Sequence, residues 1–186
     1  MNSSNKNFFA YDYKTGKNVW SIICDAPINT SAVITGDRKL IFTSQTGTLY
    51  GFDISKSDVQ TTPKWKMSFG DIITKSPAVD ASSNIYVGTN AGRLIKFMLN
   101  TNGSVSVKWN VSLGSAIQTS PVIDADSNIY VGTEKGDFYK INRLNGSTIW
   151  SYNLGAAIYS TPNISEYGTI YVSNMNGLVT AITTDK

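Results

Sequence analysis

The sequence predicts an all-β protein made of one repeated unit, a sheet of four short antiparallel strands. The first observation is a tryptophan that recurs at intervals of 45, 44 and 41 residues, at Trp20, Trp65, Trp109 and Trp150. The second is that two further columns keep the same intervals: Ile28, Ile73, Ile117 and Ile158, and Ser31, Ser76, Ser120 and Thr161. Independent columns in one register indicate an internal repeat, which is the strongest fold signal that a sequence offers.

The third observation is that each unit contains four segments with the composition of strands. In one unit they are residues 76–80, 85–89, 93–97 and 108–111. The segments are short and rich in Val, Ile, Tyr, Phe and Trp, and Asn, Ser and Gly separate them, as is typical of strands and the turns between them. Pro77, Pro121 and Pro162 stand at the start of the first segment of their units, where a missing N–H is tolerated.

Four strands in 40 to 45 residues predict the blade of a β-propeller. A blade cannot bury both faces alone, so blades stack around an axis and cover one another. We expect the tryptophans to pack between adjacent blades, because a large flat ring suits such a layer. The expected fold is a single β-propeller domain over residues 1–186, with three complete blades and partial blades at both ends. The expected boundaries are 7–23 (partial), 26–69, 71–113, 115–154 and 156–183 (partial).

This segmentation gives 17 strands, one more than four blades require. Three interpretations remain open, because every sheet edge has to be paired or protected. The chain is a fragment of a longer propeller; or two chains form a homodimer that completes an eight-bladed ring; or the chain closes alone on four blades, with its N-terminal strands finishing the last one.

Composition excludes several functions. Charged residues make up 16% of the chain, the net charge is +3, and the positive charges are scattered, which argues against nucleic-acid binding. The absence of histidine and the single cysteine, Cys24, exclude the usual zinc sites and serine or cysteine triads. No apolar stretch is long enough to span a membrane. Residues 1–7 lack the apolar core of a signal peptide. Either the chain is cytosolic, or its leader lies outside this sequence, in which case an extracytoplasmic or secreted location is expected.

Candidate binding residues lie in the loops expected to face the central cavity, before the first strand and after the second strand of each blade. They are Lys75, Asn90, Gln118, Glu134 and Tyr159. No catalytic or metal-ligating residue is predicted. Residues 124–128 superficially resemble the start of a calcium loop, but they lack the following glycine and the distant glutamate, so a hairpin turn is expected there.

The segment Ala10–x–Asp12–x–x–x–Gly16–Lys17–x–x–Trp20 resembles the tryptophan-docking motif of quinoprotein dehydrogenases. Asn142, Gly146 and Trp150 keep a reduced form of it, and the Ser-Pro and Ile-Tyr-Val-Gly-Thr segments also resemble this PQQ-like (quinoprotein alcohol dehydrogenase-like) β-propeller repeat family. The resemblance implies the propeller fold but no single activity. Some members are quinone-dependent dehydrogenases, and others resemble an outer-membrane assembly lipoprotein that scaffolds a β-barrel insertion machine.

The expected function is that of a non-catalytic scaffold that binds a protein or a surface glycan and needs no cofactor. The adjacent cysteines found in many quinone dehydrogenases are absent, since Cys24 is alone. The alternative is a fragment of a dehydrogenase that uses pyrroloquinoline quinone (PQQ) and calcium, with its catalytic residues outside this chain.

Overall fold

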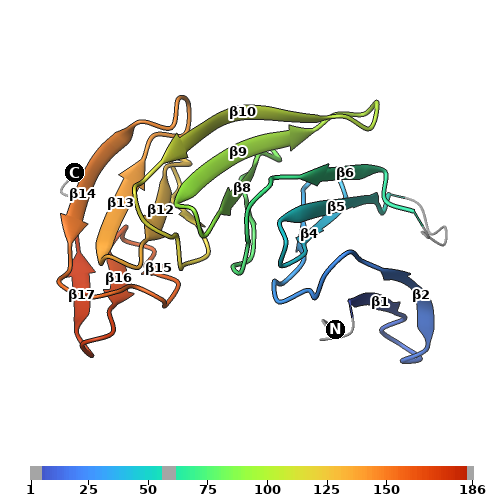
Figure 1. Ribbon diagram of the computed structural model, residues 1–186, viewed down its shortest axis with the longest axis horizontal. Coiled ribbons are helices and arrows are strands. Elements are labelled where there is room, and N and C mark those ends of the chain that lie inside the picture. The colour runs from blue at the N-terminus through green and yellow to red at the C-terminus, as the bar shows by residue number, and fades with distance from the viewer. Residues whose placement is uncertain (1–5, 56–61, 184–186) are drawn as a thin grey trace.

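The computed structural model describes residues 6–55 and 62–183, and in these residues it contains 17 strands and no helix. The strands form five antiparallel sheets that follow one another along an arch (Figure 1). The predicted fold class, a β-propeller of four-stranded antiparallel blades with partial blades at both ends, is confirmed.

The five sheets follow the order of the chain. The first pairs β1 (Asn7–Tyr11) with β2 (Asn18–Ile23). The second contains β3 (Val33–Ile34), β4 (Lys39–Thr43), β5 (Thr48–Asp53) and β6 (Trp65–Ser68). The third contains β7 (Ala78–Val79), β8 (Ile85–Gly88), β9 (Arg93–Leu99) and β10 (Val105–Ser112). The fourth contains β11 (Val122–Ile123), β12 (Ile129–Gly132), β13 (Asp137–Ile141) and β14 (Thr148–Asn153). The fifth contains β15 (Asn163–Ile164), β16 (Ile170–Ser173) and β17 (Val179–Ile182).

The two partial sheets lie at opposite ends of the arch (Figure 1). In the described residues β1 and β2 form a sheet of their own and do not pair with β15–β17. The interpretation in which the chain closes alone on four blades is therefore not the arrangement of this structure.

Hydrophobic clusters fill the spaces between successive sheets. The cluster between the second and third sheets contains Trp65, Ile73, Val87 and Phe97, all completely buried. The Trp65 indole donates a hydrogen bond from Nε1 to the carbonyl oxygen of a residue in the next blade, Asn100, at 2.6 Å. Because the ring fills the interface and its one polar group is satisfied, tryptophan suits this position.

The other three repeat tryptophans occupy the same kind of layer. Trp109 donates from Nε1 to the carbonyl oxygen of Arg143 at 3.1 Å, across the next interface. Trp20 lies in the cluster between the first and second sheets, with its ring centroid 5.3 Å from that of Phe52. Trp150 is only half-buried and packs against the cluster before the last sheet. Burial of the tryptophan thus decreases where no complete neighbouring blade covers it.

The serine and threonine column joins the blades through hydrogen bonds. The Ser31 amide donates to Ser76 Oγ at 2.7 Å, the Ser76 amide to Ser120 Oγ at 3.1 Å, and the Ser120 amide to Thr161 Oγ1 at 3.3 Å. Of the first strands that follow these residues, β7 also contacts both β3 and β11. We call this series of bonds the serine relay; it explains why a small hydroxyl residue recurs at this position.

The turn between the second and third strands requires glycine. Gly92 has a φ of 78°, and a Cβ there would lie 2.5 Å from the carbonyl oxygen of Ser115. A side chain is excluded both by the left-handed backbone and by the loop of the next blade. The recurrent glycine therefore brings this turn against the neighbouring blade.

Candidate functional site

The predicted binding residues lie on two kinds of loop that the fold brings together. Lys75, Gln118 and Tyr159 stand in the loops that lead into β7, β11 and β15, whereas Asn90 and Glu134 follow β8 and β12. Backbone hydrogen bonds join the two kinds of loop: the Asn90 amide donates to the carbonyl oxygen of Ile72, and the Glu134 amide to that of Ala116, both at 2.9 Å. We call the surface carried by these five residues the loop face.

Two members of the loop face are in direct contact across a blade boundary. Tyr159 donates a hydrogen bond from its hydroxyl to Glu134 Oε1 at 3.2 Å, and both side chains are exposed. The bond to Glu134 raises the pKa of the Tyr159 hydroxyl above its usual value, because it stabilises the protonated phenol. Tyr159 therefore stays neutral and keeps a hydrogen that it can donate.

The remaining members are neighbours rather than contacts of this pair. Asn90 Oδ1 accepts a hydrogen bond from Thr74 Oγ1 at 3.5 Å, and the Gln118 amide donates to the carbonyl oxygen of Gly132 at 3.2 Å. Lys75 is half-buried. Within residues 6–55 and 62–183, no side-chain hydrogen bond connects Lys75 or Gln118 to Tyr159 or Glu134. Apart from the Tyr159–Glu134 pair, the polar side chains of the loop face do not contact one another, and backbone hydrogen bonds hold their loops together.

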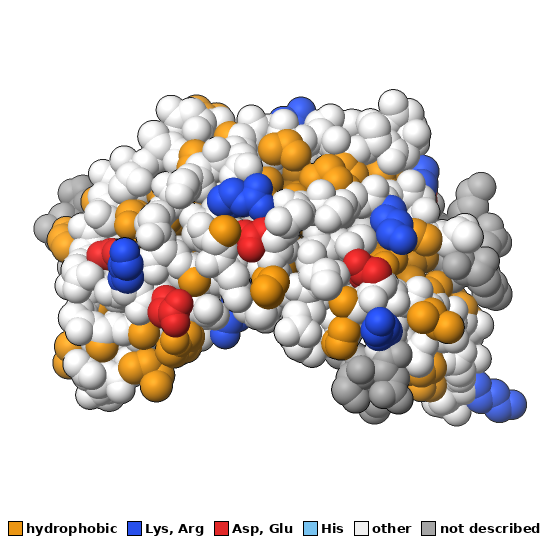
Figure 2. Space-filling view, in the orientation of Figure 1, with side chains coloured by type: hydrophobic (Ala, Val, Ile, Leu, Met, Phe, Trp, Pro, Cys, Tyr) orange, Lys and Arg blue, Asp and Glu red, His pale blue; other side chains and the backbone are white. Residues whose placement is uncertain are grey.

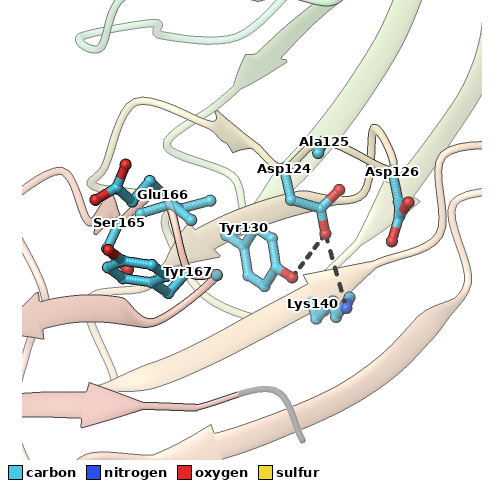
Figure 3. Close-up of a pocket in the computed structure, with 10 residues that line it drawn as sticks. Asp124, Ala125, Asp126, Tyr130, Lys140, Ser165, Glu166 and Tyr167 are labelled. Atoms are coloured by element: carbon cyan, nitrogen blue, oxygen red, sulfur yellow. Dashed lines mark hydrogen bonds and ion pairs between the residues drawn. The ribbon is translucent and has the colours of Figure 1, made fainter. Parts of the chain in front are cut away.

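A second candidate lies in a cavity of about 630 Å³ between the fourth and fifth sheets (Figure 3). It is bounded by the turn after β11 on one side and by the turn after β15 on the other. Its lining residues are Asp124, Ala125, Asp126, Tyr130, Lys140, Ile164, Ser165, Glu166, Tyr167 and Gly168.

Asp124 organises one wall of the cavity. Its Oδ2 accepts a hydrogen bond from the Tyr130 hydroxyl at 2.9 Å and lies 3.7 Å from Lys140 Nζ, and Figure 3 marks both interactions. Its Oδ1 accepts from the Asn128 amide at 2.7 Å. Burial and the bond to Asp124 raise the pKa of the Tyr130 hydroxyl far above its usual value. Residues 124–128 form the hairpin turn that joins β11 to β12.

The hydrogen bond between aspartate and tyrosine occurs again one blade earlier, where the following blade covers both residues. The Tyr86 hydroxyl donates to Asp80 Oδ2 at 2.8 Å, and Lys96 Nζ donates to the carbonyl oxygen of Arg143, in the following blade, at 2.8 Å. Asp80, Tyr86 and Lys96 are all buried. The bond between the aspartate and the tyrosine of the cavity is therefore a repeated structural feature of the blade. The lysine differs, because Lys140 pairs with Asp124 whereas Lys96 binds the following blade.

Sequence reasoning identified the hairpin at residues 124–128 but not the cavity. The opposite wall comes from Glu166 and Tyr167, both exposed, which stand where the preceding unit has Ala125 and Asp126. The signal available was the replacement of the hairpin aspartate by Ser165 in the last unit. Among the described residues, no group of three or more His, Cys, Asp or Glu side chains is placed to hold a metal ion. No described helix could cross a membrane.

Comparisons with known proteins give one family match. Residues 101–186 match the family model described as outer membrane protein assembly factor BamB. No curated protein matches the sequence.

Solved structures share the fold at low sequence identity. BamB from Moraxella catarrhalis aligns with a TM-score of 0.75 and 16% identity, over 97% of this chain and 53% of that one. The computationally designed Ika8 protein aligns with a TM-score of 0.79 and 11% identity, over 97% and 53%. The WD40 β-propeller domain of Doa1 aligns with a TM-score of 0.77 and 17% identity, over 100% and 60%.

The chain spans little more than half the length of the propellers that it resembles. At these identities the structural likeness shows the fold, and the family model adds the sequence pattern of its C-terminal 86 residues. The repeat columns of the sequence agree with both, and the segment at residues 10–20 that resembles the docking motif lies outside the matched residues. Together, the family match, the BamB-like fold and the repeat pattern support membership of this chain in the PQQ-like β-propeller repeat family.

Proposed function

We propose that this chain is a non-catalytic scaffold that binds another protein through its loop face. The observation that carries the proposal is how the loop face is held in place. Its polar side chains stand on loops that are joined to each other by backbone hydrogen bonds and that connect the strands of the sheets. Such a surface is already ordered before a partner arrives, so binding costs little conformational entropy. The family description, outer membrane protein assembly factor, agrees with a protein partner and with a location outside the cytoplasm.

The chemistry of the loop face favours recognition over catalysis. It combines two amides, one amine, one carboxylate and one phenol, and the carboxylate of Glu134 is already bonded to Tyr159. A calcium ion takes six or more oxygen ligands, several of them carboxylates, and Glu134 is the one carboxylate of the face. A partner with hydrogen-bonding groups and both signs of charge fits this surface better than a metal-bound quinone does.

The test is to immobilise the chain, identify a protein that it retains from an envelope extract, and measure its affinity in purified form. The double variant Glu134→Ala/Tyr159→Ala is expected to weaken binding at least tenfold. Tyr13→Ala is the matched control, since Tyr13 is 88% exposed on a turn far along the chain from the loop face. Equal affinity for the double variant and the parent chain would contradict the loop face as the binding site.

Two further ligands separate the remaining alternatives. A glycan array probed with the labelled chain tests the surface-glycan interpretation, and signal that the double variant loses would replace the protein partner by a glycan. Thermal unfolding with PQQ and calcium chloride tests the dehydrogenase alternative. A ligand that binds only the folded state raises the melting temperature, so an unchanged melting temperature is expected for the scaffold and an increase would contradict it.

A further inference from the structure

The last sheet leaves uncovered a face that is buried in the complete blades. Tyr171 and Val179, on β16 and β17, are 47% and 66% exposed. Their counterparts are completely or almost completely buried, Tyr130 and Phe138 one blade earlier and Tyr86 and Leu94 two blades earlier. The pairing register is the same, since Tyr171 faces Ala181 as Tyr86 faces Lys96. We call this surface the C-terminal end face. Hydrophobic side chains are visible at this end of the arch, at the lower left of Figure 2.

The opposite end of the arch exposes the other half of the same interface. Ile34, on β3, is 61% exposed. Its counterparts in the first strands of the later blades, Val79, Ile123 and Ile164, are partly buried and pack against the clusters between blades. We call the surface around Ile34 the N-terminal end face. Only β1 and β2 precede it in the described chain, so no first or second strand covers this side chain.

The two end faces are complementary by the pattern of the inner interfaces. In each of them the residue equivalent to Tyr171 lies in the same hydrophobic cluster as the residue equivalent to Ile34 of the next blade. Tyr86 shares a cluster with Ile123, and Tyr130 shares one with Ile164. Tyr171 and Ile34 are the two residues of this series that remain exposed.

The serine relay ends at the same two places. It begins at the amide of Ser31 and its last acceptor is Thr161 Oγ1. By the pattern of the relay, the next bond would run from the Thr161 amide to a hydroxyl that occupies the position of Ser31. Both residues are exposed, whereas Ser76 and Ser120, inside the relay, are half-buried.

The length of the arch determines how many copies are needed to form a closed ring. The chain aligns over 97% of its residues with 53% of BamB and of Ika8. It therefore follows the curvature of those propellers through about half of their length. A half ring that carries complementary surfaces at its two ends closes when a second copy is added by a twofold rotation.

We propose that the end faces bind each other between two copies of this chain, so that Tyr171 of each copy packs against Ile34 of the other and the serine relay becomes continuous. Each shared blade then receives β15–β17 from one copy and β1–β2 from the other. That is one strand more than an inner blade contains, because β1 and β17 both take the third position. One of these terminal strands leaves the sheet on assembly, and the contacts of Tyr171, Ile34, Ser31 and Thr161 do not depend on which one leaves.

The first measurement is the solution mass by light scattering over a hundredfold range of concentration. The expected result is a species of twice the 20.2 kDa of one chain. A monomer throughout the range would overturn the proposal. It would favour the interpretation in which further blades of a longer chain cover the end faces. Assemblies that keep growing with concentration would overturn it too, because they indicate an open array.

Single variants of each end face identify the contact. Tyr171→Lys and Ile34→Lys are each expected to reduce the mass to that of one chain. Their controls are Tyr13→Lys and Ile149→Lys, which should leave the dimer intact. Ile149 is a fair control because Lys64 and Lys108 occupy its position in the earlier blades. Circular dichroism and the unfolding transition of each monomer establish that the variant is still folded.

Mixing the two lysine variants tests the pairing of unlike ends. Each variant keeps one intact end face, so an equimolar mixture should recover a dimer that neither variant forms alone. A mixture that stays monomeric would contradict the pairing, as would an Ile34→Lys variant that remains dimeric.

A disulfide can report the relay directly. The double variant Ser31→Cys/Thr161→Cys should give a covalent dimer on oxidation, visible on a non-reducing gel, because the relay brings equivalent positions within hydrogen-bonding distance. The matched control is Ser31→Cys/Thr101→Cys, which places the second thiol on an exposed turn and should stay monomeric on the gel. Cys24 is buried and present in both variants. Equal cross-linking of the two variants would reject the relay contact.

Discussion

The interface between the second and third sheets and the surface of the fifth sheet are built from the same repeat but differ in what covers them. Around Trp65 the side chains of two complete blades interlock, and the largest of them are completely buried. On β16 and β17 the equivalent register carries Tyr171 and Val179, which are exposed. The difference shows that burial in this fold is a property of the neighbouring blade, and a residue acquires it only when the next sheet is present.

The largest expected effect is at the inner interface. Trp65→Ala removes a completely buried ring and its hydrogen bond to the carbonyl oxygen of Asn100. Truncations of this kind cost about 3 to 5 kcal/mol. Urea unfolding followed by tryptophan fluorescence and circular dichroism measures the loss.

Trp150→Ala is the matched comparison, because Trp150 occupies the same repeat position next to the incomplete last sheet and is only half-buried. We expect it to lose clearly less stability than Trp65→Ala. Equal losses for the two tryptophans would show that the neighbouring blade does not set the contribution of the ring.

The second prediction concerns close approach between blades. A Cβ on Gly132 would lie 2.5 Å from Cγ2 and 2.8 Å from Cβ of Ile158, a completely buried residue of the next blade. Gly132→Ala should therefore destabilise by about 1 to 3 kcal/mol through overpacking, measured by the midpoint of thermal unfolding.

The last sheet carries a serine at the equivalent position, Ser173, whose Oγ lies 2.7 Å from Ser160 Oγ. Ser173→Ala is expected to change stability by well under the loss at Gly132. A neutral Gly132→Ala would mean that the Ile158 side chain moves aside, and that the interface is looser than the structure indicates.

The sequence predicts the strands, the blade boundaries of the inner units and the tryptophan layer because each depends on local composition or on the repeat. The role of the Ser31 column becomes visible only in space, since the relay joins residues 41 to 45 positions apart. The contact of Tyr159 with Glu134 could not be predicted from the sequence for the same reason. The two residues are 25 positions apart and meet because adjacent blades bring their loops together. The binding role of the loop face stays a prediction.

The third prediction compares two tyrosines in one register. The Tyr86 hydroxyl donates to Asp80 Oδ2 inside the interface, whereas the hairpin residue of the last blade is Ser165 and Tyr171 is exposed. Tyr86→Phe should cost about 1 to 1.5 kcal/mol, the usual loss of a buried hydrogen bond. Tyr171→Phe should be neutral in the isolated chain. Chemical denaturation of both variants at pH 7 makes the comparison, and a loss at Tyr171 equal to that at Tyr86 would contradict it.

The same aspartate predicts a pH dependence. Burial raises the pKa of Asp80, but hydrogen bonds from Asn84, Tyr86 and the Ser82 amide outweigh it and hold that pKa below the usual value of 3.8. A carboxyl with a lowered pKa in the folded state adds stability above its unfolded pKa and loses it as the pH falls through the folded value. As the pH falls from 5 through the folded-state pKa of Asp80, the free energy of unfolding should therefore decrease less for Asp80→Asn than for the parent chain. Chemical unfolding at a series of pH values measures this difference.

The smallest expected effect is in the serine relay. Ser120→Ala removes the acceptor of the Ser76 amide but leaves the bond from its own amide to Thr161 Oγ1. The loss of one half-buried hydrogen bond should cost about 0.5 to 1 kcal/mol. Ser31→Ala is the control, because in the isolated chain Ser31 takes part in the relay through its amide, which alanine keeps. Thermal unfolding in the monomeric Tyr171→Lys background should then separate Ser120→Ala from an unchanged Ser31→Ala. If two copies close into a ring, the difference in stability between Ser120→Ala and Ser31→Ala should be smaller in the dimer. There the Ser31 hydroxyl of one copy accepts a hydrogen bond from the Thr161 amide of the other, so Ser31→Ala also loses a bond.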